Sequence, residues 1–559
     1  MAAPSFGGLA EALPAPGAAV LRWERAGGDN AKGSVTYLIH QKAANGWDMA
    51  RPVAEVKGNE WVLTGLQPGR DYEYMVRARD ASGTDGNTRS LKVRPTDAYP
   101  AAEFRGAWVQ RFEWTRGGAP DIQRKLSEVF STMGQANLNA VVFQVRGQGD
   151  TLFPSAEEPW SPLLSSGARS IDPVAFAIAE ARKNGIEFHA WMNLSVIWQA
   201  GDKKPPADRR HPFYRFADTS APGRANGVLH DASGKPRVFG DSDYVWLTHG
   251  NPEVNAYVRR QVMNFLEKYQ VQGLHWDDRT GNPHGISRDP VSVARFAGRG
   301  NPNLMKDYGG WQRDQLTRFL RDVYVQAKAK DTRLLITASP FGIADKSRIP
   351  GYSRFNDCSG FGVEPERWLR LGVLDALMPQ VYWDLPDPEP NVGTLARDWV
   401  RNNKSARPIW LGSALGKYGD VQPLSPMQVR YVALSRALGM NGNLMYHFSA
   451  GKPEEWIAAG RQMYPRKATV PVPAHMAAGR AGQLMGYVVN AEGKPLVDAW
   501  ISLPGDSTIY LSSADGFFGI PNLKPGSYPI KYSSKKGELL TQQVAIQADR
   551  TTQVKLAVP

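Results

Sequence analysis

The sequence predicts an α/β fold in which a (β/α)8 TIM barrel is flanked by two small all-β sandwich domains. The chain has 559 residues, too many for one ordinary domain of about 100–200 residues. Its first and last segments contain short alternating apolar runs between Gly, Asn and Pro turns, which is typical of β-sandwiches. The middle segment alternates short apolar runs with amphipathic helical patterns, which is typical of a parallel sheet covered by helices.

Residues 1–97 are predicted to form the first sandwich. Alternating runs such as AVLRWERA and DYEYMVRARD are separated by turn residues, without a helical period. The pattern W…LQPGRDYEYMVRA resembles a fibronectin type III domain. The resemblance implies that Trp23 packs in the core and that Tyr72 forms a corner that ties two strands together. Such modules usually space or bind, so we expect the chemistry to lie elsewhere.

Residues 484–559 are predicted to form the second sandwich, after a linker at 466–483 that is rich in Pro, Ala and Gly. The order of GYVV, EGKPL, DGFF and LKPGSY resembles a carboxypeptidase-regulatory-like (transthyretin-like) domain. Gly493 and Gly516 suit hairpin turns that need a positive φ.

Residues 99–465 are predicted to form the barrel, because eight apolar runs alternate with helical patterns. The predicted strands are 104–110, 138–146, 186–193, 271–278, 334–340, 374–383, 408–413 and 443–448. The helical patterns include 122–136, 173–184, 252–269 and 311–330. A doubly wound open sheet is the alternative. The lack of a Gly-rich dinucleotide or phosphate loop after the first strand weighs against it.

Several predicted helices begin with a cap residue followed by proline, at Asp172-Pro173, Asn251-Pro252 and Ser425-Pro426. The cap oxygen accepts a hydrogen bond from an otherwise unpaired backbone N–H. Proline at the first helical position costs no hydrogen bond, because the N–H that it lacks would have no partner within the helix.

Composition excludes several classes of protein and of functional site. The chain is 42% hydrophobic and 22% charged, which is normal for a folded soluble protein. No apolar run reaches the ~18–20 residues of a membrane helix, and no leader peptide is visible. One cysteine, Cys358, excludes an intramolecular disulfide and any multi-cysteine metal site. The net charge of +13 indicates either a solvated basic surface or attraction to an acidic polymer or surface such as a bacterial envelope. Without a dense Lys/Arg run or a nucleic-acid-binding motif, a nucleic-acid partner is disfavoured.

The candidate active site lies at the carboxyl ends of the predicted strands, as in other barrels of this type. In the stretch GLHWDD, alternation sends Leu274 and Trp276 toward the helices, and His275 and Asp277 inward, and Asp278 begins the loop. The same alternation sends further polar and aromatic side chains inward: Gln144, Arg146, His189, Trp191, Asn193, Gln380, Tyr382 and Asp384. A purely structural barrel would fill this layer with Val, Ile and Leu.

Each of these residues also has an ordinary structural interpretation. Arg146 and Asp150 suit a structural ion pair, His189 a buried core histidine, and Asp278 a cap of the following loop. Asp277 is different, because an inward carboxylate in a barrel needs a partner or a catalytic task.

The residue types favour glycoside chemistry. No H-x-H or HExxH motif is present for a metal, no lysine ends a strand for a Schiff base, and no GxSxG elbow is present. We therefore expect no cofactor and no metal. What remains is carboxylates among aromatic side chains, including Trp160, Trp191, Trp198, Trp246, Tyr382 and Trp383. Sugar rings stack on aromatic rings, and glycoside cleavage uses two carboxyl groups across the scissile bond.

The central segment resembles the bacterial glycosyl hydrolase-like family ten, a (β/α)8 group that includes a divisome-localised peptidoglycan glycan hydrolase. The matching stretches are FRGAWVQRFEW, NAVVFQVRGQGDTLFPSAEEPWSP, GIEFHAWMN, NPEVNAYVRRQV, VQGLHWDD, ITASPFGI and LDALMPQVYWD. The family differs from the xylanases also numbered ten, which use glutamates after strands four and seven. This chain has Arg279 where the family usually has Tyr after the two aspartates, and Leu194 where it usually has Pro.

The resemblance implies a glycoside hydrolase that acts on a bacterial cell-wall or related envelope glycan, in the periplasm or outside the cell. Asp277 would act as nucleophile or base and Asp384 as acid from the opposite side, with Asp278, Glu113 and Glu364 as reserve candidates for the acid. The remaining candidates would bind the sugar or tune the carboxylates: Gln144, Arg146, Asp150, His189, Trp191, Asn193, His275, Gln380, Tyr382 and Trp383. A non-catalytic glycan-binding or envelope scaffolding protein is the alternative function, because two flanking sandwiches are common on envelope anchoring proteins.

Overall fold

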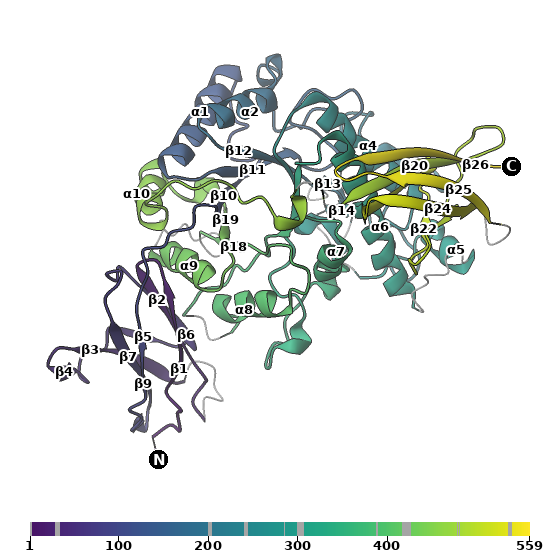
Figure 1. The fold of residues 1–559 in the computed structure, drawn as a ribbon. Helices are drawn as coiled ribbons and strands as arrows, with labels where there is room; N and C mark the ends of the chain where they lie inside the picture. The colour runs from purple at the N-terminus through teal and green to yellow at the C-terminus, as the bar shows by residue number, and fades with distance from the viewer. Residues whose placement is uncertain are drawn as a thin grey trace.

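The computed structural model describes residues 3–27, 34–199, 204–239, 244–283, 285–298, 307–386, 389–415, 426–477, 479, 481–534 and 539–559. A ring of strands surrounded by helices forms the middle of the molecule, and β-rich regions lie at its two sides (Figure 1). Among the described helices there is none with the length and apolar character required to span a membrane.

The central sheet contains eight strands within the described part of the chain, and every pairing is parallel. They are β10 (Phe104–Val109), β11 (Ala140–Arg146), β12 (Glu187–Met192), β15 (Gly273–Trp276), β16 (Leu335–Ala338), β17 (Ala376–Leu377), β18 (Leu411–Ala414) and β19 (Gly442–Tyr446). Their order is β17-β16-β15-β12-β11-β10-β19-β18. Leu377 and Gln380 also pair in parallel with Ile409 and Gly412, which joins the two edges. The sheet is therefore closed, the predicted barrel is confirmed, and an open doubly wound sheet is excluded.

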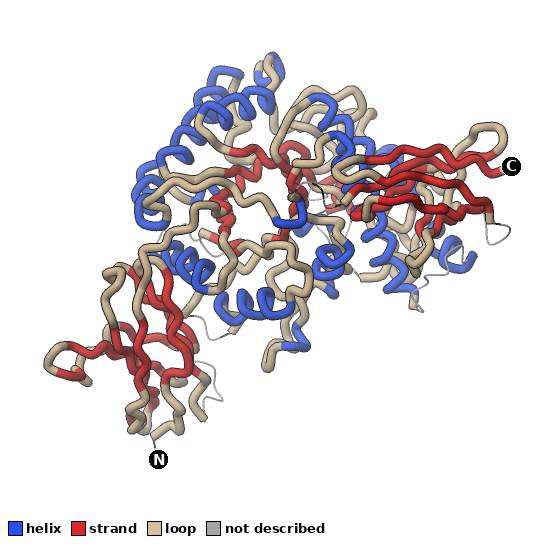
Figure 2. The backbone as a smooth tube through the Cα atoms, in the orientation of Figure 1, coloured by secondary structure: helices blue, strands red, loops and turns tan. Residues whose placement is uncertain are grey.

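Each barrel strand is followed by a helix, and the helices form the outer ring in Figure 2. They are α1 (Ala119–Gln135), α2 (Pro173–Lys183), α4 (Pro252–Lys268), α6 (Tyr308–Lys330), α7 (Pro365–Leu371), α8 (Val392–Asn402), α9 (Pro426–Ala437) and α10 (Pro453–Met463). The Asp172 side chain accepts from the Ala175 N–H and the Asn251 side chain from the Glu253 N–H, both at 3.0 Å. These two predicted caps are confirmed, and Ser425 lies outside the described residues.

The sixth predicted strand, 374–383, is much shorter in the structure, where β17 covers Ala376–Leu377. Pro379 follows directly and has no N–H to donate to a neighbouring strand, so regular pairing stops there. A hairpin of β13 (Val196–Gln199) and β14 (Tyr244–Trp246), with the short helix α3 (Phe213–Phe216), is inserted after β12. Helix α5 (Pro290–Gly298) precedes α6.

The alternation predicted for GLHWDD is confirmed for Leu274, His275 and Trp276. Leu274 and Trp276 belong to the apolar layer between the sheet and the helices. The interior side of the barrel holds a separate cluster that includes Phe104, Trp108 and Trp191, and the His275 ring contacts Trp108 there.

The N-terminal region is all-β. Its strands are β1 (Leu9–Ala15), β2 (Ala18–Trp23), β3 (Thr36–Ala43), β4 (Gly46–Trp47), β5 (Ala54–Val56), β6 (Glu60–Thr64), β7 (Tyr72–Asp80), β8 (Gly83–Thr84) and β9 (Ser90–Val93). As expected, Trp23 is buried in its core, and the Tyr72 hydroxyl accepts from the Gln67 N–H at 2.9 Å. The region packs on the barrel through Glu60, which pairs with Arg397 of α8 at 2.6 Å, and through Arg430 of α9, which donates to the Val62 carbonyl.

The C-terminal region is also all-β. Its strands are β20 (Gly482–Asn490), β21 (Trp500–Ser502), β22 (Tyr510–Leu511), β23 (Phe517–Leu523), β24 (Gly526–Ser533), β25 (Leu540–Ile546) and β26 (Thr551–Val558). Gly493 and Gly516 both have a φ of 78°, as predicted. Arg259 of α4 lies over the Phe517 ring at 3.9 Å and pairs with Asp515 at 2.5 Å, so this region is fastened to the barrel helices.

The predicted linker, which we call the strap, is anchored to the barrel at Thr469 and at His475. The Thr469 N–H donates to the Ala101 carbonyl at 3.0 Å, and His475 Nε2 lies 2.9 Å from the buried carboxylate of Asp375. These two contacts fasten the strap to the barrel, so this Pro- and Ala-rich segment is not a loose tether.

Candidate active site

Asp277 follows β15 directly, at the carboxyl end of the barrel, and is only 7% exposed. Its carboxylate accepts from the Arg279 N–H at 2.9 Å. Burial raises the pKa of Asp277 to about 7; the neighbouring Asp278 carboxylate adds to this rise, and Arg279 and Arg111 oppose it. A carboxyl group with such a pKa is protonated in a large fraction of molecules at neutral pH, which is the property of a general acid.

The loop that carries Asp277 is held by Ser195, between β12 and β13. Ser195 donates its N–H to the Arg279 carbonyl at 3.2 Å and its hydroxyl to the Thr280 carbonyl at 2.7 Å. Asp278 is partly exposed and pairs with Arg279, whose guanidinium also lies over the Tyr244 ring at 5.4 Å. Arg279, which replaces the tyrosine usual in the resembled family, therefore neutralises Asp278 beside the buried carboxyl.

An aromatic floor, formed by Trp108, Tyr382 and Tyr446, lies in the barrel interior. The ring of Trp108 lies 6.2 Å from Tyr382 and 5.9 Å from Tyr446, and the two tyrosines stack on each other at 5.4 Å. His275 contacts Trp108 and bonds Thr337 and Ser339 at 2.8 and 2.9 Å, so both its ring nitrogens are used within the barrel. Burial lowers the pKa of His275, so it remains neutral beneath the site.

Glu113 lies on the far wall from Asp277. In the ring of eight described strands, β10 is three places from β15, and β19 is directly opposite it. The Glu113 side chain, 3% exposed, accepts from the Gln110 and Ser449 N–H groups at 3.0 and 3.1 Å. His447, after β19, lies 3.2 Å from the same carboxylate. These contacts hold Glu113 in one orientation at the mouth.

The Tyr446 hydroxyl links the two walls electrostatically. Burial raises the pKa of Tyr446 to about 12; Arg279 opposes the rise, and Asp278, Glu113 and Asp277 add to it. Carboxylates from both walls therefore act on one hydroxyl of the aromatic floor.

Asp384 lies differently from the expectation. It follows β17, which only β16 separates from β15, so it is not opposite Asp277. Its carboxylate accepts from the hydroxyl of Tyr431 on α9, in the helix layer. The reserve candidate Glu364 pairs with Arg367 at 2.8 Å beside α7. Gln380 donates to the Ser339 carbonyl at 3.2 Å. Trp383 packs against Phe341 at 5.7 Å, toward the helix layer.

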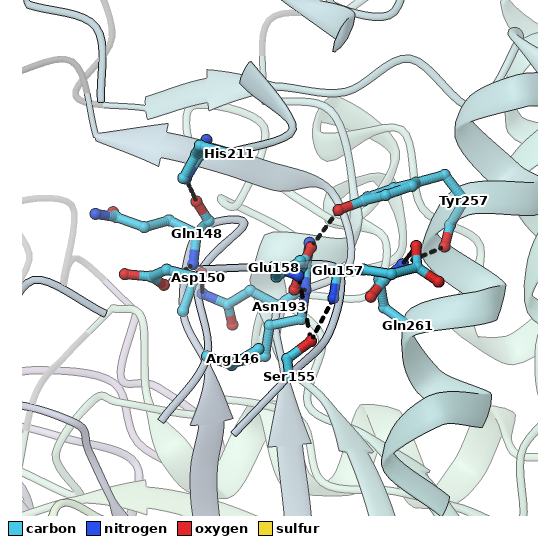
Figure 3. Close-up of polar contacts among 12 residues, drawn as sticks. Arg146, Gln148, Asp150, Ser155, Glu157, Glu158, Asn193, His211, Tyr257 and Gln261 are labelled. Atoms are coloured by element: carbon cyan, nitrogen blue, oxygen red, sulfur yellow. Dashed lines mark hydrogen bonds and ion pairs between the residues drawn. The ribbon is translucent and has the colours of Figure 1, made fainter. Parts of the chain in front are cut away.

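The candidates on β11 and β12 mostly bond one another (Figure 3). Arg146 pairs with Glu158 through two hydrogen bonds of 2.8 and 2.7 Å and also donates to the Asn193 carbonyl. The suggested structural ion pair of Arg146 is therefore formed with a different partner than Asp150. Asn193 accepts from the Trp191 indole at 2.8 Å and donates to the Gly147 carbonyl at 2.9 Å.

Two further candidates lie beneath the mouth. The Gln144 side chain accepts from the Arg111 N–H at 3.2 Å. His189 is fully buried against Phe104 at 5.4 Å, near the first residues of the strands, which is the position of a core histidine. A Cβ added at Gly273 would lie 2.0 Å from His189 Nδ1, so a residue larger than glycine would clash with His189 at this position.

Comparison with known proteins decides the family. Residues 103–419, more than half of the chain, match the glycosyl hydrolase-like 10 family. The chain belongs to this family. It is a glycoside hydrolase, and its substrate is a polysaccharide. The central segment is therefore assigned to the same family that its motifs resembled.

The relatives are distant. Glycosyl hydrolase DigH of Escherichia coli (strain K12) is 23% identical over 367 residues, which cover 60% of this chain and 78% of DigH. Glycosyl hydrolase YngK of Bacillus subtilis (strain 168) is 24% identical over 377 residues, which cover 63% of this chain and 69% of YngK. The glycoside hydrolase domain of PgaB (BpsB) from Bordetella bronchiseptica aligns over 66% of this chain and all of that domain, with 16% identity and a TM-score of 0.47.

Sequence reasoning missed part of the mouth of this glycoside hydrolase. Trp108 and Tyr446 follow the same alternation as Asp277, so that rule, applied to FRGAWVQ and NLMYHF, would have found them. Arg111, Phe112 and His447 lie just past strand ends, where side-chain direction follows no period. Within the residues that the structure describes, no group of three or more His, Cys, Asp or Glu side chains is arranged to hold a metal ion.

Proposed function

We propose that this protein cleaves glycosidic bonds in a bacterial cell-wall glycan of the peptidoglycan type, or in a related envelope glycan, with Asp277 and Glu113 as the reacting carboxyl groups. The observation behind this proposal is the buried Asp277 carboxyl, with a pKa of about 7, at the carboxyl end of a barrel whose interior holds an aromatic floor. Glycoside hydrolysis needs one carboxyl group to protonate the leaving oxygen and a second to act as base or nucleophile.

Asp277 suits the general acid. The sequence suggested a nucleophile or base, but a carboxyl whose pKa lies near 7 is still protonated where most aspartates are not. Glu113 suits the partner role better than Asp384, because its strand lies nearly opposite β15 and its side chain is held by defined donors. Asp384 is engaged by Tyr431 in the helix layer.

The substrate class rests on the family resemblance and on charge. A chain with a net charge of +13 is attracted to anionic polymers, and cell-wall polymers are anionic. The same attraction to cell-wall polymers supports a location in the periplasm or outside the cell. Tyr382 and Tyr446, which are partly exposed, would provide apolar ring faces for the sugar, and the buried Trp108 supports them. Gln110, which donates to the Tyr446 hydroxyl at 3.0 Å, would orient that floor.

The test is release of reducing ends from purified peptidoglycan glycan strands without stem peptides. Asp277→Asn and Glu113→Gln should each lower the rate by about 10²–10⁴-fold, the usual contribution of an acid or base. Asp384→Asn serves as the matched control and should stay within a few-fold of wild type. Wild-type rates in Asp277→Asn would remove the proposed acid. Binding of the strands without any turnover would instead indicate a glycan-binding protein.

A further inference from the structure

Arg111 is a buried cation at the mouth that no function described so far explains. It follows β10 and is only 4% exposed. Its backbone is fixed on both sides, because its N–H donates to Gln144 and its carbonyl accepts from the Thr115 hydroxyl at 2.7 Å. Its guanidinium lies over the Phe112 ring at 4.3 Å.

A glycine makes room for this guanidinium. A Cβ added at Gly147 would lie 3.0 Å from Arg111 Cδ and 3.1 Å from its Nε. Arg111 is therefore packed between Phe112 and the backbone of the loop that follows β11, and its donors point in a fixed direction.

Arg111 lacks the partner that a buried arginine normally has. Arg146, equally buried, is paired with Glu158. Among the described residues, Arg111 has no ion pair within salt-bridge distance, and its buried Nη2 has no hydrogen-bond partner. A buried charge without a partner is strongly unfavourable, because it has lost its hydration and gained no interaction in return. A protein keeps such a group where a ligand completes it.

Two buried acceptors in the adjacent loop share this property. Gln148 Oε1 and Asp150 Oδ2 are buried and have no hydrogen-bond partner among the described residues. Figure 3 shows both side chains extending to the same side of their loop, away from the Arg146–Glu158 pair. Because the Arg111 side chain packs against Gly147, the residue before Gln148, an unused donor and two unused acceptors belong to or adjoin one loop. Donors and acceptors of this kind are the complement of a polyhydroxylated ring.

We propose that Arg111, Gln148 and Asp150 form a sugar subsite beside Asp277, in which Arg111 Nη2 donates to an oxygen of the bound sugar and the two acceptors accept hydrogen bonds from its hydroxyl groups. The inference rests on the proposed function, since it assumes that the sugar lies at Asp277. The charge of Arg111 reaches that carboxyl and opposes the rise of its pKa. Arg111 therefore also tunes the acid.

The test compares Arg111→Lys and Arg111→Gln with Arg116→Gln, an exposed arginine of the same loop. Binding of peptidoglycan glycan strands is measured by calorimetry in the Asp277→Asn background. A hydrogen bond from a charged group contributes about 1.5–3 kcal/mol, so both Arg111 variants should bind about tenfold or more weakly. Arg116→Gln should bind like its parent.

The pH profile of kcat/KM separates subsite loss from general damage. The charged groups around Asp277 are Asp278 and Arg279 on its own loop, Arg111 from the β10 loop, and the Tyr446 hydroxyl from β19. Arg111→Gln removes a positive charge, so the limb that Asp277 controls should move to higher pH. Arg111→Lys keeps the charge and should leave the limb in position while binding weakens.

Thermal unfolding shows whether each variant folds. If Arg111→Gln does not fold, Arg111→Lys still provides the test. Parent-like binding by a folded Arg111 variant, with an unchanged profile, would overturn the inference. Failure of the wild type to release reducing ends would instead overturn the proposed function. In that case Arg111-dependent binding would still support the subsite.

Discussion

Two buried aspartates at opposite ends of the barrel have opposite acid–base properties. Asp375, just before β17, is fully buried and contacts Lys328 at 2.8 Å, His475 at 2.9 Å and Arg407 at 3.3 Å. Burial alone would raise its pKa, but the charges of Lys328 and Arg407 and the hydrogen bond from His475 outweigh burial and hold the pKa of Asp375 well below its usual range. Asp277, at the other end, has its pKa raised to about 7. The difference separates a carboxylate used to fasten the fold from one available for chemistry.

The largest expected difference concerns activity. Asp277→Asn should lower glycan-strand hydrolysis by about 10²–10⁴-fold, because it removes the only proton that the proposed acid can give. Asp375→Asn should leave the rate per folded molecule within a few-fold, because Asp375 lies at the end of the barrel away from the mouth. The measurement is reducing-end release, normalised to the folded fraction by circular dichroism. A comparable loss per folded molecule in both variants would mean that the two aspartates do not differ in this way.

For stability we expect the reverse: Asp375→Asn should lose more free energy of unfolding than Asp277→Asn. Asp375→Asn leaves Lys328, Arg407 and His475 without their shared anion, and breaking a buried charge network costs about 3–5 kcal/mol. The midpoint of urea unfolding measures this loss on the full chain. Lys330→Ala, which removes an exposed ion pair with Glu267, is the control and should cost at most about 1 kcal/mol. Equal midpoints for Asp375→Asn and wild type would show that the strap at His475 does not depend on this carboxylate.

The same comparison explains which parts of the molecule can be predicted from sequence. Strict alternation in strands placed His275 and Asp277 inside and Trp276 outside, because successive side chains of a strand must face opposite sides. The partner of Arg146 could not be predicted, since Glu158 lies in an irregular loop and Asp150 is nearer to Arg146 in the sequence. Loop positions such as Glu113 obey no period, which is why the strand rule favoured Asp384 over it.

The pH dependence of stability should distinguish the two aspartates next. The folded pKa of Asp277, about 7, lies above the unfolded value of about 3.9, so its contribution is fully present below pH 4 and is lost as pH rises through 7. The free energy at stake is about 1.4 kcal/mol per pKa unit. The Tm of Asp277→Asn should therefore rise relative to the Tm of the wild type as the pH is raised from 5 to 8.

For Asp375 the pH dependence of stability has the opposite sign. Its folded pKa is depressed, so its contribution is present above the unfolded pKa and is lost only as pH falls toward the folded value. Asp375 itself does not titrate between pH 5 and 8, and Asp375→Asn should not show the Tm gain expected for Asp277→Asn. A Tm difference between Asp277→Asn and wild type that stays constant from pH 5 to 8 would contradict the raised pKa.

The smallest expected effect concerns the surface that leads into the mouth. Phe112 is 49% exposed although it lies beside the nearly buried Arg111, so one ring face is covered by the guanidinium and much of the ring meets solvent. An exposed ring at a sugar-binding mouth offers a stacking face worth about 0.5–1.5 kcal/mol, so Phe112→Ala should weaken glycan-strand binding about threefold to tenfold. Leu371→Ala, an equally exposed apolar side chain at the end of α7, is the matched control and should bind like wild type. Because the helices run antiparallel to the strands, that position lies at the end of the barrel occupied by Asp375, and a shared loss in both variants would trace the effect to stability and not to the mouth.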